Sequence, residues 1–164
     1  MPSGLLKVSG DGFKDKRFLK YAKEFSKKYF ATTIVGGGSA ISIAFEEAGY
    51  KSDNFCLVGR QPQSLPEKQL MRDILEEQQA SCQDLFNREK IGSRVIIPWR
   101  EAASVSCPEN GDVTILSLYI GFDKIVIFTR YDNVEAKKQW LKKLALCFKH
   151  INPGRFDKIE VRGF

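Results

Sequence analysis

Residues 32 to 49 have the sequence TTIVGGGSAISIAFEEAG. The β-branched run at 32–35 predicts a buried parallel strand, and three glycines, Gly36, Gly37 and Gly38, follow it at once. Apolar residues then recur at helical spacing up to Gly49, a residue type that often ends a helix. A strand, a glycine turn and a helix in this order can present backbone N–H groups and a positive helix end to an anion. We therefore predict that Gly36–Gly38 bind a phosphate or a similar anion, and a tight turn without a ligand is the alternative.

The rest of the chain alternates predicted strands with predicted helices. Apolar and β-branched runs predict strands at 4–9, 94–98, 124–129 and 158–161. Amphipathic spacing predicts helices at 15–29, 40–48, 66–87, 112–120 and 137–149, while 99–110 is expected to be a loop. This alternation predicts an α/β fold, a three-layer αβα sandwich with a mainly parallel sheet. The length of 164 residues suits one domain over residues 1–164.

The charge of the chain permits an anionic ligand. The formal net charge is +6, but the basic residues are scattered over helices in the manner of solvated faces. No RNP, zinc-finger or helix-turn-helix signature accompanies them, so we consider nucleic acid an unlikely partner. No apolar run approaches the ~20 residues of a membrane span, and the N-terminus lacks the apolar segment of a signal peptide. We expect a cytoplasmic protein that does not bind a membrane.

The cysteines and the single histidine do not predict a metal site. The four cysteines form no CxxC pair, and only His150 could join them as a zinc ligand. We expect reduced and mostly buried thiols at Cys56, Cys82, Cys107 and Cys147.

Lys7 is unusually placed inside an apolar strand and directly before a glycine turn, Gly10-Asp11-Gly12. The carboxyl ends of parallel strands meet at one edge of the sheet, where α/β proteins bind ligands. We therefore expect Lys7 and Gly10 to lie with the second glycine turn around a phosphate. The alternative is a strand-end lysine whose ammonium group reaches solvent. Asp112 fits two interpretations equally, a helix cap or a carboxylate at the mouth of the site.

These motifs, taken in order, resemble those of the amino acid kinase superfamily, which has the carbamate-kinase-like fold. The opening Leu5-Leu6-Lys7-Val8-Ser9-Gly10-Asp11 is similar to the first strand of uridylate kinases, and Val35 to Gly38 resembles the second glycine loop of the family. Gly59-Arg60 before a long helix is similar to the substrate-side arginine of N-acetylglutamate kinases. Asn110-Gly111-Asp112 resembles the Asn-x-Asp motif of the family. The strand that ends at Thr129 resembles the strand before the nucleotide-binding loop, and Asp132-Asn133-Val134 resembles the Asp-Gly-Val of that loop.

The resemblance implies a role for each matching residue. Lys7 would neutralise charge on the transferred phosphoryl group, and Asp112 would orient the catalytic lysine. The backbone at Gly10, Gly36, Gly37 and Gly38 would bind phosphate oxygens. Arg60 would hold the acceptor, while Thr129 and Asp132 would border the adenosine of ATP, with Mg²⁺ bridging its phosphates. Phosphoryl transfer of this kind depends on positioning and charge stabilisation.

The chain departs from the family in three respects. It is considerably shorter than the complete enzymes, and Asn133 stands where the nucleotide loop has glycine. The second catalytic lysine of the family, in a Gly-Met-x-x-Lys setting, has no clear match. The candidates near the expected position are Lys137, Lys138, Lys142 and Lys143, and each also fits a solvated helix face.

Three functions are therefore considered. The first is a small ATP-dependent kinase that acts on a nucleoside monophosphate, with UMP slightly favoured, or on a carboxylate or phosphate acceptor. The second is a non-catalytic nucleotide or metabolite binder with the same fold. The third is a dinucleotide-binding protein, because Gly36 to Ile41 partly matches GxGxxG, although Ile41 stands where glycine or alanine is usual. The resemblance and the long middle helix also imply a homodimer or a higher homo-oligomer.

Overall fold

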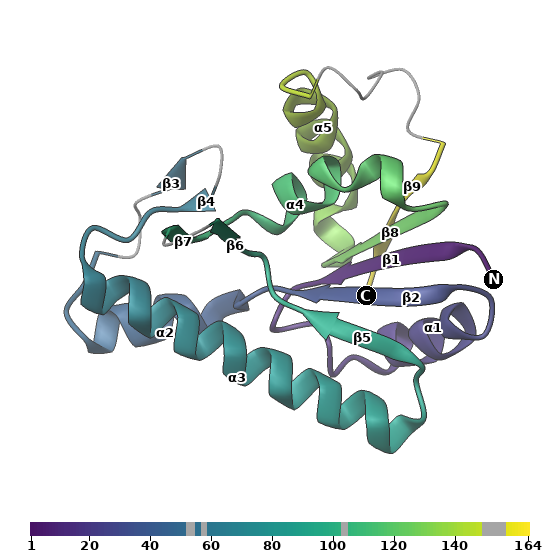
Figure 1. Cartoon of the computed structure of the whole chain (residues 1–164), viewed down its shortest axis with the longest axis horizontal. Helices are drawn as coiled ribbons and strands as arrows, with labels where there is room; N and C mark the ends of the chain where they lie inside the picture. The colour runs from purple at the N-terminus through teal and green to yellow at the C-terminus, as the bar shows by residue number, and fades with distance from the viewer. Residues whose placement is uncertain (52–54, 57–58, 103–104, 149–156) are drawn as a thin grey trace.

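The centre of the molecule is a five-stranded sheet in which every strand is parallel to its neighbours. The computed structural model describes residues 1–51, 55–56, 59–102, 105–148 and 157–164, so His150 lies outside the described residues. Figure 1 shows the strand order β5-β2-β1-β8-β9. The strands are β1 (Ser3–Val8), β2 (Phe30–Val35), β5 (Ser93–Ile96), β8 (Lys124–Thr129) and β9 (Ile159–Gly163).

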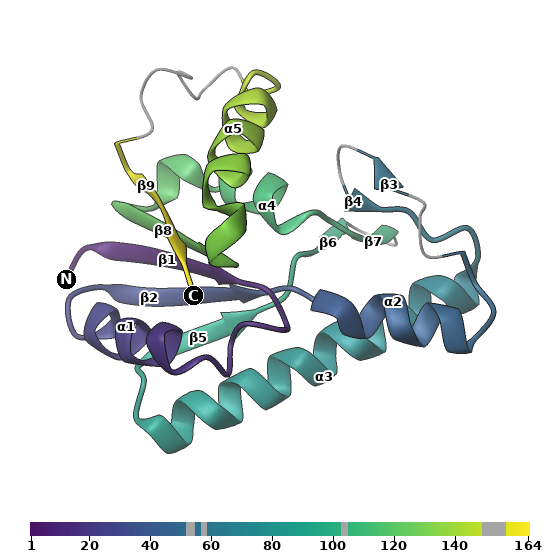
Figure 2. The same ribbon diagram turned by 180° about the vertical axis from the view of Figure 1, so that it is seen from behind.

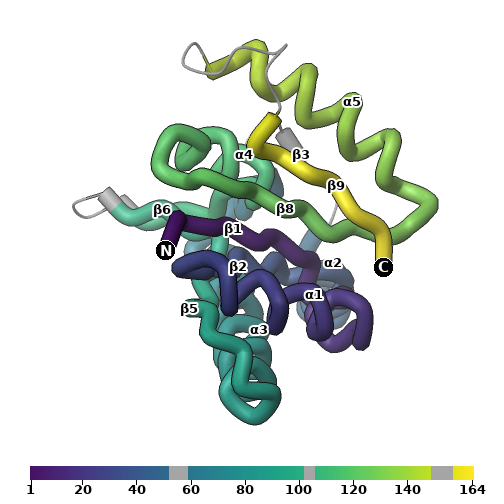
Figure 3. The backbone as a smooth tube through the Cα atoms, turned by 90° about the vertical axis from the view of Figure 1, so that its right-hand side faces the viewer, coloured from purple at the N-terminus to yellow at the C-terminus, as the bar shows by residue number. Residues whose placement is uncertain are grey.

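Helices cover both faces of this sheet, because successive side chains of a strand point to opposite faces. Leu6 and Val8 of β1 pack with the helices α1 (Lys16–Ser26) and α3 (Leu65–Glu89). Leu5 belongs to a second core with α4 (Gly111–Ser117) and α5 (Val134–Ala145). Figure 3 shows α5 and α3 on opposite sides of the strands. The predicted αβα arrangement with a mainly parallel sheet is confirmed.

A further unit extends past the carboxyl ends of β2 and β5, as Figures 1 and 2 show. The helix α2 (Gly38–Glu47) packs against α3 through Ile41, Phe45, Met71 and Leu75. Two short hairpins lie nearby, β3 (Phe55–Cys56) with β4 (Gly59–Arg60), and β6 (Trp99–Ala102) with β7 (Val105–Pro108). Two 3₁₀ segments, η1 (Tyr119–Gly121) and η2 (Tyr131–Asn133), flank β8. No helix in the described part of the chain is long and apolar enough to cross a membrane.

Two expectations from the sequence were wrong. The segment 99–110, expected to be a loop, contains the hairpin β6–β7, in which Trp99 pairs with Pro108. The expectation of mostly buried thiols also fails, because Cys82 is buried while Cys107 and Cys147 are exposed. These three cysteines are free, and the side chain of Cys56 lies outside the described part of the structure.

Candidate functional site

The strand order places a candidate site at the carboxyl end of β1. From β1 the chain continues to β2 and β5 on one side of the sheet, and later to β8 and β9 on the other. Ligands of open α/β sheets bind at such a switch point, outside the carboxyl ends of the strands. A cavity of about 460 Å³ lies there, and residues from several separate segments line it: Lys7, Gly36, Arg60, Met71, Asn110 and Trp140.

A buried carboxylate joins two lysines at this cavity. Asp112 is only 2% exposed, and its Oδ1 atom lies 3.3 Å from the Nζ atom of Lys7. The Nζ atom of Lys137 donates a hydrogen bond of 2.7 Å to the other carboxylate oxygen, Oδ2. Lys7 and Lys137 come from β1 and α5, which are far apart in the sequence. The fold therefore brings two positive charges to one carboxylate, and one of them, Lys7, lines the cavity.

The charges around Asp112 determine its protonation. Burial by itself would raise the pKa of this carboxyl, because it removes the charged form from water. The ammonium groups of Lys7 and Lys137 outweigh that effect and lower the pKa to about 2. The cluster thus keeps one negative and two positive charges at neutral pH, with a net charge of +1.

Asp112 does not cap the helix on which it lies. Asn110 is the N-cap of α4, and its side chain accepts a 2.9 Å hydrogen bond from the Asp112 N–H. Gly111 allows β1 to approach, since a Cβ atom there would lie 3.2 Å from Cε of Lys7. Asn110 therefore caps α4, and Gly111 allows the close approach of Lys7. The Asp112 carboxylate is not used in capping and contacts the two lysines instead.

The two glycine turns predicted to meet are in contact. A Cβ atom at Gly10 would lie 2.6 Å from the Gly36 carbonyl oxygen, so the first turn needs glycine to pack on the second. The Gly36 N–H already donates to the Val8 carbonyl oxygen, and this group is thus not available for a phosphate. Within the described part of the chain, the Gly10 and Gly37 N–H groups donate no hydrogen bond. They are the backbone donors at this edge that a ligand could use.

The start of α2 is not bare, contrary to the expectation from the sequence. Asp11 accepts hydrogen bonds of 3.0 and 3.1 Å from the Ser39 N–H and one of 2.6 Å from its hydroxyl group. Gly38 makes room for this contact with a left-handed φ of +59°. The Asp11 carboxylate therefore occupies the anion position at the N-terminus of α2, and a ligand phosphate would depend on the lysines instead.

Arg60, which the resemblance predicts to hold the acceptor, lines the same cavity as Lys7. Its guanidinium group borders the cavity, donates a 2.8 Å hydrogen bond to the Ser42 hydroxyl group and lies 5.3 Å from the centre of the Phe45 ring. Burial lowers the pKa of Arg60, although an arginine keeps its charge at physiological pH. The apolar wall beside it consists of Ile41, Met71, Leu75 and Pro98.

Thr129 and Asp132 do not border this cavity. Thr129 is the last residue of β8, and Asp132 in η2 is largely exposed and pairs with Arg130 at 3.6 Å. They lie on the other side of the switch point from Gly36 and Arg60, with β1 between the two groups of strands. The sequence-predicted residues thus form one cluster at the cavity and a separate pair after β8.

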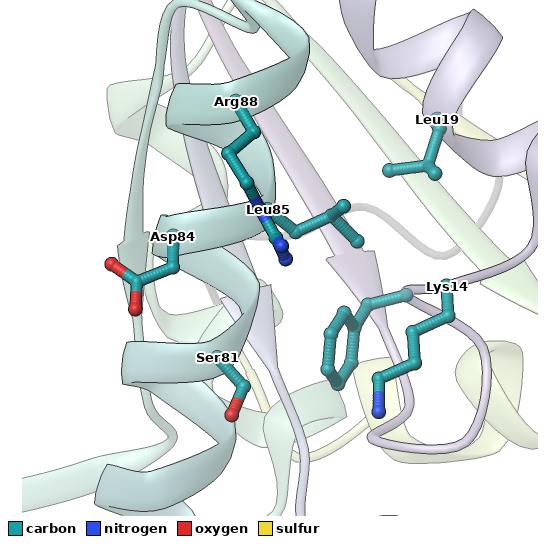
Figure 4. A pocket seen from close by; sticks show the side chains of 7 residues that line it. Lys14, Leu19, Ser81, Asp84, Leu85 and Arg88 are labelled. Carbon is teal, nitrogen blue, oxygen red and sulfur yellow. The ribbon is translucent and has the colours of Figure 1, made fainter.

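A second depression, of about 450 Å³, lies between α1 and α3 (Figure 4). Lys14 and Arg88 extend over an apolar floor that includes Leu85, while the Asp84 carboxylate points away from them. This depression belongs to the α1 and α3 side of the sheet, whereas Lys7 and Leu5 point to the α4 and α5 side. None of the predicted site residues lines it.

Two residues of the site were missed or left undecided by the sequence. Lys137 was one of four candidates, and its position is explained by Leu141 and Leu144, which lie four and seven residues later and are buried. This spacing places Lys137 on the inner face of α5, a signal that the sequence contains. Trp140 belongs to none of the motifs found in the sequence, yet its indole N–H donates a 3.1 Å hydrogen bond to Oδ2 of Asp112.

Several polar groups at this edge of the sheet could bind an anion. Lys7 and Lys137 supply positive charge, and the Gly10 and Gly37 N–H groups supply donors without a partner among the described residues. No cluster of three or more His, Cys, Asp or Glu side chains suited to a metal ion is found in the described ranges. In comparisons with known proteins, no family model matches the chain and no curated protein resembles it significantly.

Proposed function

We propose that this protein is a small ATP-dependent kinase of the amino acid kinase type. It would transfer a phosphoryl group to a nucleoside monophosphate such as UMP, or to a carboxylate or phosphate acceptor. The observation that carries the proposal is the buried Asp112 carboxylate held between Lys7 and Lys137 at the switch-point cavity. Two partly buried cations near the Gly10 and Gly37 N–H groups are suited to the negative charge of a phosphoryl group in transfer.

The residues of the chain would promote transfer by holding the phosphoryl group in place and by stabilising its negative charge. Lys7 and Lys137 would neutralise the oxygens of the transferred group, while Asp112 would keep both ammonium groups oriented. The Gly10 and Gly37 N–H groups would donate hydrogen bonds to phosphate oxygens. ATP with Mg²⁺ supplies the phosphoryl group when bound, and the ion would be carried by the phosphates.

The acceptor would lie on the Arg60 side of the cavity. A guanidinium group binds carboxylates and phosphates in a fixed, two-pronged geometry, and Ile41, Met71 and Leu75 offer an apolar surface for the rest of an acceptor. Thr129 and Asp132 would then border the adenosine on the other side of β1, as the resemblance implies. A dinucleotide is less well supported, because Asp15 and Asp11 already cap the helices after the two glycine turns.

Transfer of the phosphoryl group tests this proposal. ADP release from Mg·ATP would be measured with UMP, CMP, glutamate, aspartate and carbamate as acceptors, in the wild type and in Lys7→Ala and Lys137→Ala. We expect acceptor-dependent release in the wild type and a loss of about 10²–10³-fold in each variant, as when one transition-state donor is removed.

Lys138→Ala is the matched control, because Lys138 follows Lys137 on α5 but is exposed and pairs with Glu135. It should retain wild-type turnover. ATP binding without ADP release would point to a non-catalytic binder instead, and turnover that survives both Lys7→Ala and Lys137→Ala would exclude the proposed site.

A further inference from the structure

The indole of Trp140 forms the third contact of Asp112. Trp140 lies three residues after Lys137 on α5, so both side chains extend from the same face of that helix. Its Nε1–H group donates a 3.1 Å hydrogen bond to Oδ2 of Asp112, and the residue also lines the cavity. The indole thus links the core between α4 and α5 to the charged group of the site.

The contacts of the Asp112 carboxylate are unequal at its two oxygens. Oδ2 accepts two hydrogen bonds, from Lys137 at 2.7 Å and from Trp140 at 3.1 Å. Oδ1 is buried and accepts no hydrogen bond, although Nζ of Lys7 lies 3.3 Å away. The pair on Oδ2 fixes the rotation of the carboxylate, and the Lys7 ammonium group keeps its N–H bonds free to point elsewhere.

We propose that Trp140 is a positioning residue that holds Asp112 so that Lys137 is bound tightly and Lys7 remains available to the transferred phosphoryl group. This inference rests on the proposed kinase function and assigns a role to a residue outside the motifs that suggested it. Without the indole N–H, Lys137 alone would hold Oδ2, and the carboxylate could rotate to turn its 3.3 Å ion pair with Lys7 into a hydrogen bond. The ammonium group of Lys7 would then be drawn away from its ligand.

Kinetics separate this role from simple packing. Trp140→Phe keeps an aromatic ring in the wall and removes only the N–H donor, while Trp99→Phe is the matched control because its indole bonds to Ser106 outside this cavity. We expect Trp140→Phe to lower kcat about 10- to 100-fold, the effect of one hydrogen bond to a charged group, and to change the KM for Mg·ATP less than about twofold. Trp99→Phe should retain the wild-type kcat.

A spectroscopic measurement tests the contact without relying on activity. In ¹⁵N-labelled Trp99→Phe protein, the one remaining indole N–H resonance belongs to Trp140. We expect Asp112→Asn to shift this resonance strongly and Lys138→Ala to leave it in place. An indole N–H resonance whose chemical shift is the same with and without Asp112→Asn would overturn the inference. An unchanged kcat in Trp140→Phe would overturn it as well.

The two proposals fail in different ways. If the wild type releases no ADP with any acceptor, the kinase function is wrong, and the catalytic role of Trp140 falls with it. If the wild type is active and Trp140→Phe is equally active, the kinase function stands and the positioning role alone is excluded.

Discussion

Asp112 carries a negative charge in a position that would destabilise the fold if the charge had no partner. The carboxyl is 2% exposed, and an unpaired buried carboxylate costs several kcal/mol. Lys7 on β1, and Lys137 and Trp140 on α5, offset this cost. Stability and function would thus depend on the same group of side chains.

The lowered pKa of Asp112 predicts a stability change in acid. The carboxyl has a pKa of about 2 in the folded protein against 3.8 ordinarily, so its contribution is present above about pH 4 and is lost as the pH falls toward 2. We expect the free energy of unfolding of the wild type, relative to Asp112→Asn, to fall by about 2 kcal/mol over that range. Urea unfolding of both proteins at pH 5 and pH 2 measures this difference, and a difference independent of pH would contradict the assignment.

Lys137 illustrates how far single residues were predictable. The sequence offered four lysines on one predicted helix. Only Lys137 stands four and seven residues before the buried Leu141 and Leu144, so the helical spacing could have selected it. The hydrogen bond from Lys137 to Asp112 could not be predicted in the same way, because it depends on how α5 packs beside α4.

At the scale of elements, the turn between β2 and α2 is stabilised by Asp11, whose carboxylate accepts hydrogen bonds from the Ser39 N–H. The Gly38 Cβ position lies 2.7 Å from the Asp11 carboxylate, and the φ of +59° disfavours any side chain. Gly49 also has a positive φ, of +74°, but open space surrounds its Cβ position. Alanine substitutions at these two glycines therefore distinguish two contributions to the free energy of unfolding. Both introduce backbone strain, but only the substitution at Gly38 also disturbs the Asp11 contact.

We expect Gly49→Ala to lower the free energy of unfolding by about 1 kcal/mol through backbone strain alone. Gly38→Ala should cost at least about 1 kcal/mol more, because it also disturbs a helix cap. Urea unfolding provides both values. Equal losses in the two variants would mean that Asp11 contributes nothing to the turn.

The elements themselves were predicted unevenly, for physical reasons. The strand predicted at 124–129 follows from β-branched composition and is confirmed. The helix predicted at 15–29 is confirmed over Lys16–Ser26, with the Asp15 side chain as its N-cap. The hairpin β6–β7 was missed because Pro98 precedes it, Pro108 ends its second strand, and both strands are only four residues long. Its position depends on α3 instead, through Arg72, which pairs with Glu101 at 2.9 Å and lies over the Trp99 ring.

At the scale of the whole molecule, the parallel order β5-β2-β1-β8-β9 unites residues that lie up to 130 positions apart, from Lys7 to Lys137. The sequence predicted that the glycine turns would share one sheet edge, because all parallel strands end there. It could not predict that Asp11 would cover the start of α2, since this depends on how closely the turns approach. The proposed anion site would consequently depend on side-chain cations more than on a helix end.

The resemblance to amino acid kinases also predicts a homodimer. Light scattering should then give a mass about twice the 18.6 kDa of one chain. The mass of one chain over a wide concentration range would contradict this prediction, without bearing on the cavity itself.

Calorimetry of Mg·ATP binding to the wild type and to Lys7→Ala tests the central claim most directly. We predict saturable binding to the wild type, weakened at least about tenfold in Lys7→Ala through loss of one charged hydrogen bond, and unchanged in Lys138→Ala. Far-ultraviolet circular dichroism should show a retained fold in Lys7→Ala, because Lys137 and Trp140 still bind Asp112. No binding by the wild type, or equal affinity in the wild type and Lys7→Ala, would contradict the claim that this cavity holds the phosphates of a nucleotide.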